Sequence, residues 1–377
     1  MKKLKIFPKQ KSDLSLLIVI VLLSIWGTVM IFSAGSAYAY ARYDDSAYFI
    51  KKQILWLILG FIVLFSASRI PPQIYRKATP FLYLITLFLL ALVLVVGFVG
   101  NGAKRWISIG PITIQPSEIA KITIIMMLSY YFSKYESRAL SEAKKSEIFK
   151  YGTLFPALIF LIPIILVMLQ KHLSCIIILG LIGLCMTVCA GVNLRYITFF
   201  CTLGASGVAA LALFTDYTKE RILVWRNPEA YKLTGGWQTL QGLMAIGSGG
   251  IFGVGLGKSV MKHCYVSEPA NDMIFAILCE ETGLVGAVGT LLLFFLLVIR
   301  TLKISLNASD VYSRLVAFGI GAKMAIQVLL NVAVVTNSIP NTGISLPFFS
   351  YGGSSLLMIF FEMGILLSIS RNARITK

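Results

Sequence analysis

One carboxylate in this chain stands where it could act on an amphiphilic molecule. Asp272 ends a long polar loop, and a hydrophobic segment begins at the next residue, Met273. A carboxylate at such a boundary can reach water, a lipid headgroup and a hydrocarbon tail together, so Asp272 is a candidate catalytic residue. Aspartate is also favoured at the start of a helix, where it caps free N–H groups and complements the helix dipole. Position alone leaves both interpretations open.

Basic residues occur in the segments that we expect on the same side of a membrane as Asp272. They are Lys104, Arg105, Lys121, Arg221, Arg226, Lys258 and Lys262. Lysine and arginine would suit a diphosphate group, although each residue taken alone is more typical of a charge that faces lipid headgroups.

Other motifs are weaker. The run 253–259, Gly-Val-Gly-Leu-Gly-Lys-Ser, is similar to a P-loop, but that motif needs glycine where Phe252 stands, and no strand precedes it. Nucleotide binding is therefore rejected. The two histidines lie far apart and form no metal-binding spacing. Of the six cysteines only Cys264 falls in a polar loop, which leaves no outer pair for a disulfide.

Four charged residues lie well inside hydrophobic segments, away from the segment ends. Unpaired charges are costly there, so such residues usually form ion pairs or mark a transport pathway. Glu280 and Glu281 lie one helical step apart, and we expect at most one of them to face the protein interior. Lys323 is predicted to pair with one of the glutamates at comparable depth, Glu280, Glu281 or Glu362. A structural ion pair and a pathway for protons or substrate both stay open.

The elements that position these residues are predicted to cross a membrane. Hydrophobic residues make up 57% of the 377 residues and charged ones 13%, whereas a soluble protein carries roughly a quarter charged residues. Apolar runs near the length needed to span a bilayer are continuous, which indicates helices and not a barrel. About ten spans are predicted, at 14–34, 53–68, 79–99, 118–133, 152–169, 173–190, 195–214, 272–299, 315–336 and 354–370.

The fold class is thus an all-α polytopic membrane protein, with residues 1–377 in a single integral membrane domain. The first apolar run is longer than that of a typical signal peptide and is interpreted as an uncleaved span. Ten spans place both termini on one side, and the more basic segments then lie in the cytoplasm. The net charge of +18 is explained by this topology and by anionic membrane lipids, not by nucleic acid.

Three outer segments are unusually apolar, aromatic and rich in glycine: 100–117, 215–271 and 337–353. Backbone of this kind at a membrane face is tolerated when it is buried in protein or lines a wet cavity. We therefore predict a large structured extracytoplasmic loop over 215–271, not a mobile one.

Several ordered blocks along nearly the whole chain resemble the SEDS family of bacterial membrane proteins, represented by RodA, FtsW and SpoVE. The blocks are Gly-Ala-Lys-Arg-Trp-Ile at 102–107, Gln-Pro-Ser-Glu at 115–118 with Lys121, Gly-Trp-Gln at 236–238 with Gln241, Ala-Ile-Gly-Ser-Gly-Gly at 245–250, Asp-Met-Ile-Phe-Ala at 272–276 with Glu280 and Glu281, Ile-Pro-Asn-Thr-Gly at 339–343 and Ser-Tyr-Gly-Gly-Ser at 350–354.

The resemblance implies a peptidoglycan glycosyltransferase that polymerises lipid II on the outer face of the bacterial cytoplasmic membrane, with a class B penicillin-binding protein, a transpeptidase, as partner. The family's proposed catalytic aspartate falls on Asp272, which would act as general base. Positive charge or a divalent cation (Mg²⁺ or Mn²⁺) would stabilise the departing undecaprenyl diphosphate. The predicted substrate-binding residues are Lys104, Arg105, Glu118, Lys121, Arg221, Gln241, Lys258 and Glu281.

The chain departs from the family pattern in one block. Gln-Lys-His-Leu-Ser-Cys at 170–175 replaces the usual Gln-Pro-Asp-x-Gly-Thr, so any role of an acidic residue at 172 is lost. Glu118 and Lys121, three residues apart at a helix start, could pair with each other instead of binding substrate. Two rival functions remain, a lipid II flippase with a polar path between the membrane faces and a scaffold that only recruits a transpeptidase.

Overall fold

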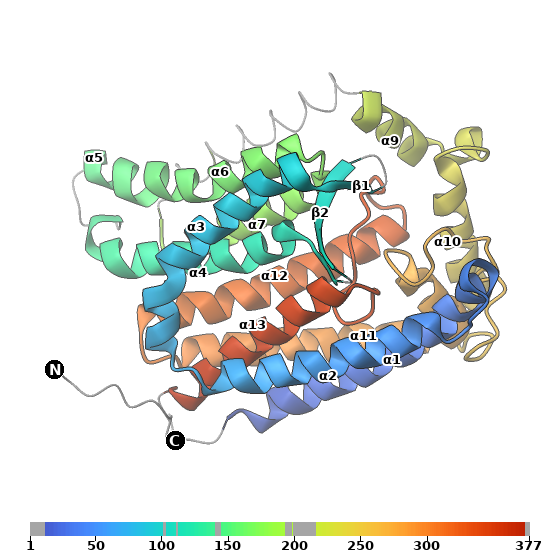
Figure 1. Cartoon of the computed structure of the whole chain (residues 1–377), viewed down its shortest axis with the longest axis horizontal. Coiled ribbons are helices and arrows are strands. Elements are labelled where there is room, and N and C mark those ends of the chain that lie inside the picture. The colour runs from blue at the N-terminus through green and yellow to red at the C-terminus, as the bar shows by residue number, and fades with distance from the viewer. Residues whose placement is uncertain are drawn as a thin grey trace.

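The computed structural model of the protein describes residues 12–100, 103–110, 112–139, 145–192, 198 and 216–373. Most of this chain is helical, and the long helices lie side by side in a bundle (Figure 1). The helices are α1 (Leu14–Tyr43), α2 (Tyr48–Arg69), α3 (Pro72–Val96), α4 (Pro116–Ala139), α5 (Lys145–Glu147), η1 (Ile148–Leu154), α6 (Phe155–Leu169), α7 (Leu173–Cys189), α9 (Asp216–Arg226), η2 (Pro228–Tyr231), α10 (Gly236–Gly249), α11 (Ile274–Leu306), α12 (Val311–Val335) and α13 (Gly353–Arg371).

The prediction of a polytopic all-α membrane protein is confirmed. Within the described residues, seven helices are long and apolar enough to cross a membrane: α1, α2, α3, η1 with α6, α11, α12 and α13. The predicted span 118–133 falls within α4, and the predicted span 173–190 corresponds to the shorter helix α7. The predicted span 195–214 lies outside the described residues, apart from Thr198.

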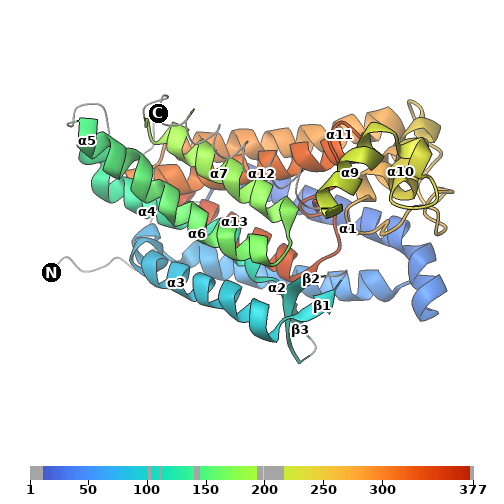
Figure 2. The ribbon, with the colours of Figure 1, turned by 90° about the horizontal axis from the view of Figure 1, so that it is seen from above.

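The two ends of the bundle differ. The beginning of α1 and the end of α13 lie together, and the backbone N–H of Asp13 donates to the Ser370 hydroxyl at 3.1 Å. Helices α9 and α10 lie at the opposite end (Figure 2). The described part of the predicted loop 215–271 is therefore structured, as expected, and covers one end of the bundle.

Helix α4 carries charges because it runs through the interior of the bundle. It packs against α3, α6, α7 and α12, and its side chains Ile124, Ile125 and Leu128 are fully shielded from the surroundings. A helix with protein on most sides does not need an apolar surface for lipid. Its polar residues must instead be paired within the bundle.

A small antiparallel sheet, which was not predicted from the sequence, precedes α4. Its strands are β1 (Phe98–Gly100), β2 (Ala103–Ile109) and β3 (Ile112–Ile114), in the order β1-β2-β3. The turn between β2 and β3 contains Gly110 at a φ of +62°, a conformation that glycine adopts at low cost. The Gly-Pro pair at 110–111 between β-branched residues was the available signal.

Helix α11 consists of two helices joined at Gly283, whose φ is +65° and ψ −166°. The segment after α10 pairs with this break. Val254 N–H donates to the Glu280 carbonyl at 3.0 Å, and Leu284 N–H donates to the Gly250 carbonyl at 3.0 Å. A side chain at Gly283 would collide with the backbone at Gly253, 2.3 Å away. The first part of α11 is thus a short helix that begins beside Asp272.

Lys323 of α12 pairs with Glu362 of α13, as the prediction of a partner at comparable depth allows. Its ammonium donates to both carboxylate oxygens, at 2.6 and 2.8 Å, and both side chains are fully buried. The pair ties two helices that make few other contacts with each other. The structural interpretation therefore accounts for these two charges.

Replacing Lys323 by Met should leave Glu362 buried without a cation, which costs about 3–5 kcal/mol of folding free energy. The double variant Lys323→Met/Glu362→Met removes both charges and should recover most of that loss. Thermal denaturation of the purified variants in detergent measures both effects. A double variant as unstable as the single one would contradict the assignment.

Candidate active site

Asp272 lies immediately before α11 but does not cap it. The N-cap position is Met273, and no side chain caps the helix. The Asp272 carboxylate accepts instead from its own backbone N–H and from the Gln238 side chain. Its Oδ1 atom is shielded from solvent and has no hydrogen-bond partner among the described residues. The capping interpretation is therefore wrong, and a shielded carboxylate oxygen remains available.

The surroundings of Asp272 shift its proton affinity. Burial raises the pKa of this carboxyl to about 6, and the nearby Glu268 carboxylate adds to the rise. Arg221 and the hydrogen bond from Gln238 act in the opposite direction. A carboxyl with a pKa of about 6 is ionised at neutral pH and takes up a proton more readily than an exposed aspartate. These are the properties of a general base.

The backbone on both sides of Asp272 is fixed by the segment that precedes α13. The Asn331 amide of α12 donates to the Asp272 carbonyl at 2.9 Å and to the Ile344 carbonyl at 2.6 Å. The Ser350 hydroxyl donates to the Asn271 carbonyl at 2.7 Å. Asn331 was not among the predicted site residues, although an asparagine inside a predicted apolar span was a signal that it has a buried polar partner.

Three polar side chains from separate elements meet around the Asp272 carboxylate. Arg221 of α9 donates to the Asn341 carbonyl, and the Asn341 amide donates to Gln238 Oε1 of α10 at 3.2 Å. The Cα of Gly343 faces the carboxylate, because a Cβ added there would lie 3.4 Å from Asp272 Oδ2. Arg221 was predicted as a site residue. Gln238 and Asn341 were not, although both fall in matched sequence blocks.

Arg105 is connected to the 341–343 segment indirectly, through the block 170–175. Its guanidinium donates to the Lys171 carbonyl, and its Nε atom is buried without a partner among the described residues. Ser174 at the start of α7 donates to the Thr342 carbonyl. The altered block 170–175 therefore connects β2, which carries Arg105, to the loop beside Asp272. Lys104 is exposed and lies near the end of α3, 3.5 Å from the Leu94 carbonyl.

His172 occupies the position where the family pattern has an acidic residue. Burial and the nearby Arg105 lower the pKa of its imidazole to about 3. The ring is therefore neutral at physiological pH, and its Nδ1 lies 3.4 Å from the Ser117 hydroxyl. A neutral, partly buried histidine stands here in place of an acidic residue, so this block supplies no carboxylate partner for Arg105.

Glu118 and Lys121 pair with each other, as their spacing predicts. Their side chains are buried and separated by 2.7 Å, and the Ser355 hydroxyl of α13 donates to Glu118 at 3.3 Å. This pair lies within electrostatic range of Lys323 and Glu362. The arrangement places both residues inside the bundle, where they join α4 to α13. Their predicted role in substrate binding stays a prediction.

The expectation that at most one of Glu280 and Glu281 would face the interior is wrong, because both are buried. Glu281 pairs with Lys262 at 3.0 Å and accepts from the Ser33 hydroxyl at 2.7 Å. Glu280 accepts from the Ser259 hydroxyl at 2.5 Å and from a neighbouring N–H at 2.8 Å. The segment 250–262 folds back beside the break in α11, so protein covers both sides of the helix.

The remaining predicted substrate-binding residues are not gathered around Asp272. The Glu281 carboxylate is occupied by Lys262 and Ser33, which leaves it little capacity for a ligand. Lys258 is exposed on the segment 250–262, and Gln241 is buried on α10. The structure brings Arg221 to Asp272, and it gives Lys104, Lys258 and Gln241 no contact with Asp272 among the interactions described.

The described residues contain no group of three or more His, Cys, Asp or Glu side chains that could hold a metal ion. Glu268 is the acidic residue within electrostatic range of Asp272. Magnesium demands about six oxygen ligands and is often held by one or two carboxylates together with substrate phosphates. The unpartnered Oδ1 of Asp272 fits a magnesium ion held jointly by a carboxylate and substrate phosphates. It does not fit a site made of protein ligands alone.

The apolar helices and the Asp272 site define a polytopic membrane protein with a shielded carboxylate oxygen that has no partner among the described residues. The chain matches the FtsW/RodA/SpoVE family of cell cycle proteins over residues 13–375, and it belongs to that family. The resemblance noted in the sequence is thereby confirmed.

Among its relatives, stage V sporulation protein E of Bacillus subtilis is 40% identical over 370 residues, which cover 97% of this chain and 99% of that protein. A probable peptidoglycan glycosyltransferase FtsW of Geobacter sulfurreducens is 36% identical over 364 residues, covering 96% of this chain and 95% of the relative.

Solved structures show the same fold. The crystal structure of the rod shape determining protein RodA of Thermus thermophilus matches with a TM-score of 0.70 and 27% identity, covering 96% of this chain and 97% of that one. A chain from a study of how a peptidoglycan synthase complex coordinates polymerization and crosslinking matches with a TM-score of 0.79 and 27% identity, covering 96% and 98%.

The pairing of Lys262 with Glu281 predicts that two nearby lysines differ in their effect on stability. Lys262→Met should lower the free energy of unfolding by about 3 kcal/mol or more, because it leaves Glu281 buried without its cation. Lys258→Met, four residues earlier on an exposed side chain, should change it by less than about 0.5 kcal/mol. Thermal denaturation in detergent compares the two, and equal effects would show that the buried pair is not what stabilises the segment.

Proposed function

We propose that this protein is a peptidoglycan glycosyltransferase that polymerises lipid II into glycan strands, with Asp272 as general base. Family membership and the names of its relatives support the activity. The observation that carries the role of Asp272 is its carboxylate, which combines a raised pKa with a shielded oxygen that has no hydrogen-bond partner among the described residues. Such a carboxylate can accept a hydrogen bond from a bound hydroxyl group.

In the proposed reaction the sugar 4-hydroxyl of the acceptor attacks C1 of the donor sugar. A new C1–O bond forms, the bond from C1 to the diphosphate oxygen breaks, and undecaprenyl diphosphate leaves with the bonding electrons. The hydroxyl proton passes to the Asp272 carboxylate, which must therefore be ionised at the start. A hydroxyl is a weak nucleophile, and a positioned base typically contributes about 10²- to 10⁴-fold to the rate.

Negative charge builds on the diphosphate as it leaves, and cations near Asp272 would stabilise it. Arg221 is the first choice, because it is within electrostatic range of the carboxylate. Arg105 on β2 is connected to the 341–343 segment through the block 170–175 and would suit a more distant part of the diphosphate. The role of Lys104, which lies near the end of α3, stays a prediction. The beginning of α11 adds the positive end of a helix dipole. A divalent cation, if bound by Asp272 and substrate oxygens, would supply further charge.

We place this reaction on the outer face of the bacterial cytoplasmic membrane, with both termini in the cytoplasm. The relative basicity of the segments supports this orientation. A class B penicillin-binding protein is the proposed partner. The similarity to a chain studied within a peptidoglycan synthase complex supports that choice.

The flippase alternative needs a continuous polar path between the membrane faces. The charges that would make it are engaged in two separate closed pairs, Lys323 with Glu362 and Lys262 with Glu281. Each carboxylate has its donors within the protein. The structure therefore favours the enzyme over the transporter.

Asp272→Asn should fold and insert normally but polymerise lipid II at least about 100-fold more slowly, because an amide cannot accept the hydroxyl proton. Purified protein with its transpeptidase partner and lipid II, with and without a divalent cation, would be assayed by separating glycan products on a gel. The double variant Asn271→Asp/Asp272→Asn is the matched control. It keeps one carboxylate but moves it to the preceding residue, so it should stay inactive. If Asp272→Asn polymerised lipid II at the unaltered rate, Asp272 would not be the general base.

The pKa of about 6 for Asp272 predicts the pH dependence of kcat/KM. The base works when ionised, so kcat/KM should be level above the pKa and fall about tenfold per unit as pH drops below 6. Arg221 lowers this pKa, and Arg221→Met should move the descending limb to higher pH. Arg226→Met, on the exposed last turn of the same helix, should leave the limb in place. A profile unchanged by Arg221→Met contradicts the electrostatic coupling.

A further inference from the structure

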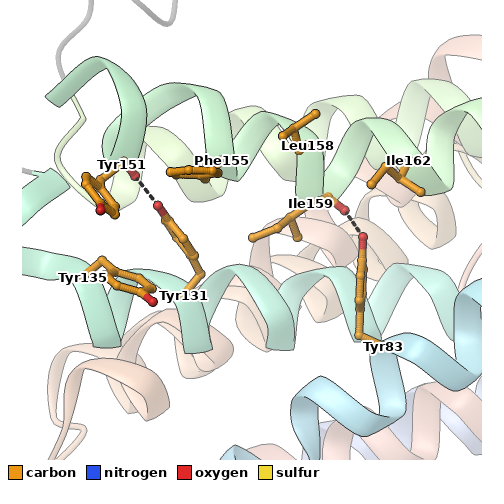
Figure 3. A pocket seen from close by; sticks show the side chains of 8 residues that line it. All are labelled: Tyr83, Tyr131, Tyr135, Tyr151, Phe155, Leu158, Ile159 and Ile162. Atoms are coloured by element: carbon orange, nitrogen blue, oxygen red, sulfur yellow. Dashed lines mark hydrogen bonds between the residues drawn. The ribbon is translucent and has the colours of Figure 1, made fainter. Parts of the chain in front are cut away.

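A cavity of about 450 Å³ lies between α3, α4 and α6, and none of the site residues discussed above lines it (Figure 3). Its lining side chains are all aromatic or aliphatic: Tyr83, Tyr131, Tyr135, Tyr151, Phe155, Leu158, Ile159 and Ile162. Binding sites for small organic ligands typically enclose a few hundred Å³ and are mostly apolar. The cavity is therefore large enough for part of a hydrocarbon ligand.

A proline in α6 explains one wall of the cavity. Pro163 has no backbone N–H, so the carbonyl four residues earlier, at Ile159, has no partner within the helix. An unpaired carbonyl is costly in a membrane. The Tyr83 hydroxyl of α3 donates to this carbonyl at 2.7 Å. The tyrosine ring therefore spans the gap between α3 and α6 and keeps the two helices apart.

The opposite wall has the same origin. At the end of η1 the Phe155 N–H donates to the Lys150 carbonyl, which is five residues back. In that register the Tyr151 carbonyl faces Pro156, which has no N–H to give. The Tyr131 hydroxyl of α4 donates to the Tyr151 carbonyl at 2.9 Å. Figure 3 shows both hydrogen bonds, with Phe155, Leu158 and Ile159 between them.

The open side of the cavity faces the surroundings of the bundle. Phe155, Leu158 and Ile162 on α6 are each about 40–44% exposed, and α6 is one of the candidate membrane spans. The hydroxyls of Tyr83 and Tyr131 are already engaged by carbonyls, so they offer little to water. An apolar cavity that opens toward the membrane suits a hydrocarbon chain.

Cations lie beside one end of the cavity. Lys134 and Lys150 are exposed neighbours of the lining residues Tyr135 and Tyr151. Of the acidic side chains described in this part of the chain, Glu136 lies 3.8 Å from Arg314 and Glu147 is exposed. The two exposed lysines fit an anionic headgroup.

The cavity and the Asp272 site lie toward opposite ends of α4. Glu118, near the start of α4, contacts Ser355 in the first turn of α13. The segment that precedes α13 contacts the backbone around Asp272. Tyr131 follows thirteen residues later, roughly 20 Å along the helix axis. A lipid with its headgroup beside Lys134 would therefore belong to the other leaflet from a substrate at Asp272.

We propose that this cavity binds one acyl chain of an anionic phospholipid, with the headgroup at Lys134 and Lys150 in the leaflet opposite the Asp272 site. The acyl chain of the lipid fills the space between the two tyrosine–carbonyl hydrogen bonds. The bound lipid is a structural partner of α6 and takes no part in glycan chemistry, so the proposal does not depend on the proposed function.

Photolabelling tests this proposal. The purified full chain is reconstituted in liposomes with phosphatidylglycerol that carries a diazirine on its acyl chain, irradiated, and mapped by mass spectrometry. Peptides containing 131–135 and 155–162 should be labelled several-fold more than the lipid-facing part of α2 around Ile58. Equal labelling of all lipid-facing surfaces would mean that lipid merely surrounds the protein, and the proposal would fail.

Two sets of variants separate the cavity from the surface. Leu158→Trp fills the cavity and should reduce the label several-fold, whereas Ile165→Trp, exposed on the same helix outside the cavity, should not. Lys134→Gln/Lys150→Gln should reduce labelling by the anionic probe to the level of a phosphatidylcholine probe. Unchanged labelling in both Leu158→Trp and the lysine variant overturns the proposal. Stronger labelling of these peptides by a diazirine-bearing undecaprenyl phosphate would assign an isoprenoid chain instead and overturn it equally.

Discussion

The cost of an unpaired charge among hydrocarbon groups is the constraint on which this structure depends. Each charged side chain that the described bundle buries deeply has a partner of opposite sign or several hydrogen-bond donors, and these partners join elements distant in sequence. The buried ion pairs are Lys323–Glu362, Lys121–Glu118 and Lys262–Glu281. Breaking any of these pairs would leave a buried charge without a partner. The pairs therefore specify which helices meet and at what depth.

The same constraint applies to the backbone. Gly283 interrupts α11, and the carbonyl groups freed by the break accept from the segment that follows α10. The prolines of α6 free carbonyls that Tyr83 and Tyr131 satisfy. In both places an irregular helix is tolerated because another part of the chain supplies the missing partner. The break in α11 shortens the helix next to Asp272 and fixes both of its ends.

Much of this could be predicted from the sequence, because its signals are local. Apolar run lengths gave the spans, and the three-residue spacing of Glu118 and Lys121 gave their ion pair. The surroundings of Asp272 could not be predicted, since Gln238, Asn331 and Asn341 reach it from separate elements through side-chain contacts. The prediction that at most one of Glu280 and Glu281 faces the interior was wrong for a related reason. Helical periodicity describes one regular helix, and it contains no information on a segment that folds back over the helix's other face.

Asp272 differs from the other buried carboxylates in a way that folding alone does not explain. Both oxygens of Glu362 accept from Lys323, and Glu281 accepts from Lys262 and Ser33. Burial raises the pKa of Asp272, so its ionised form is less stable in the folded protein than in water. Its Oδ1 has no partner among the described residues. Stability is thus lost at this position while its backbone is held by Asn331. A rigidly held and incompletely paired carboxylate is what a bound hydroxyl group would complete.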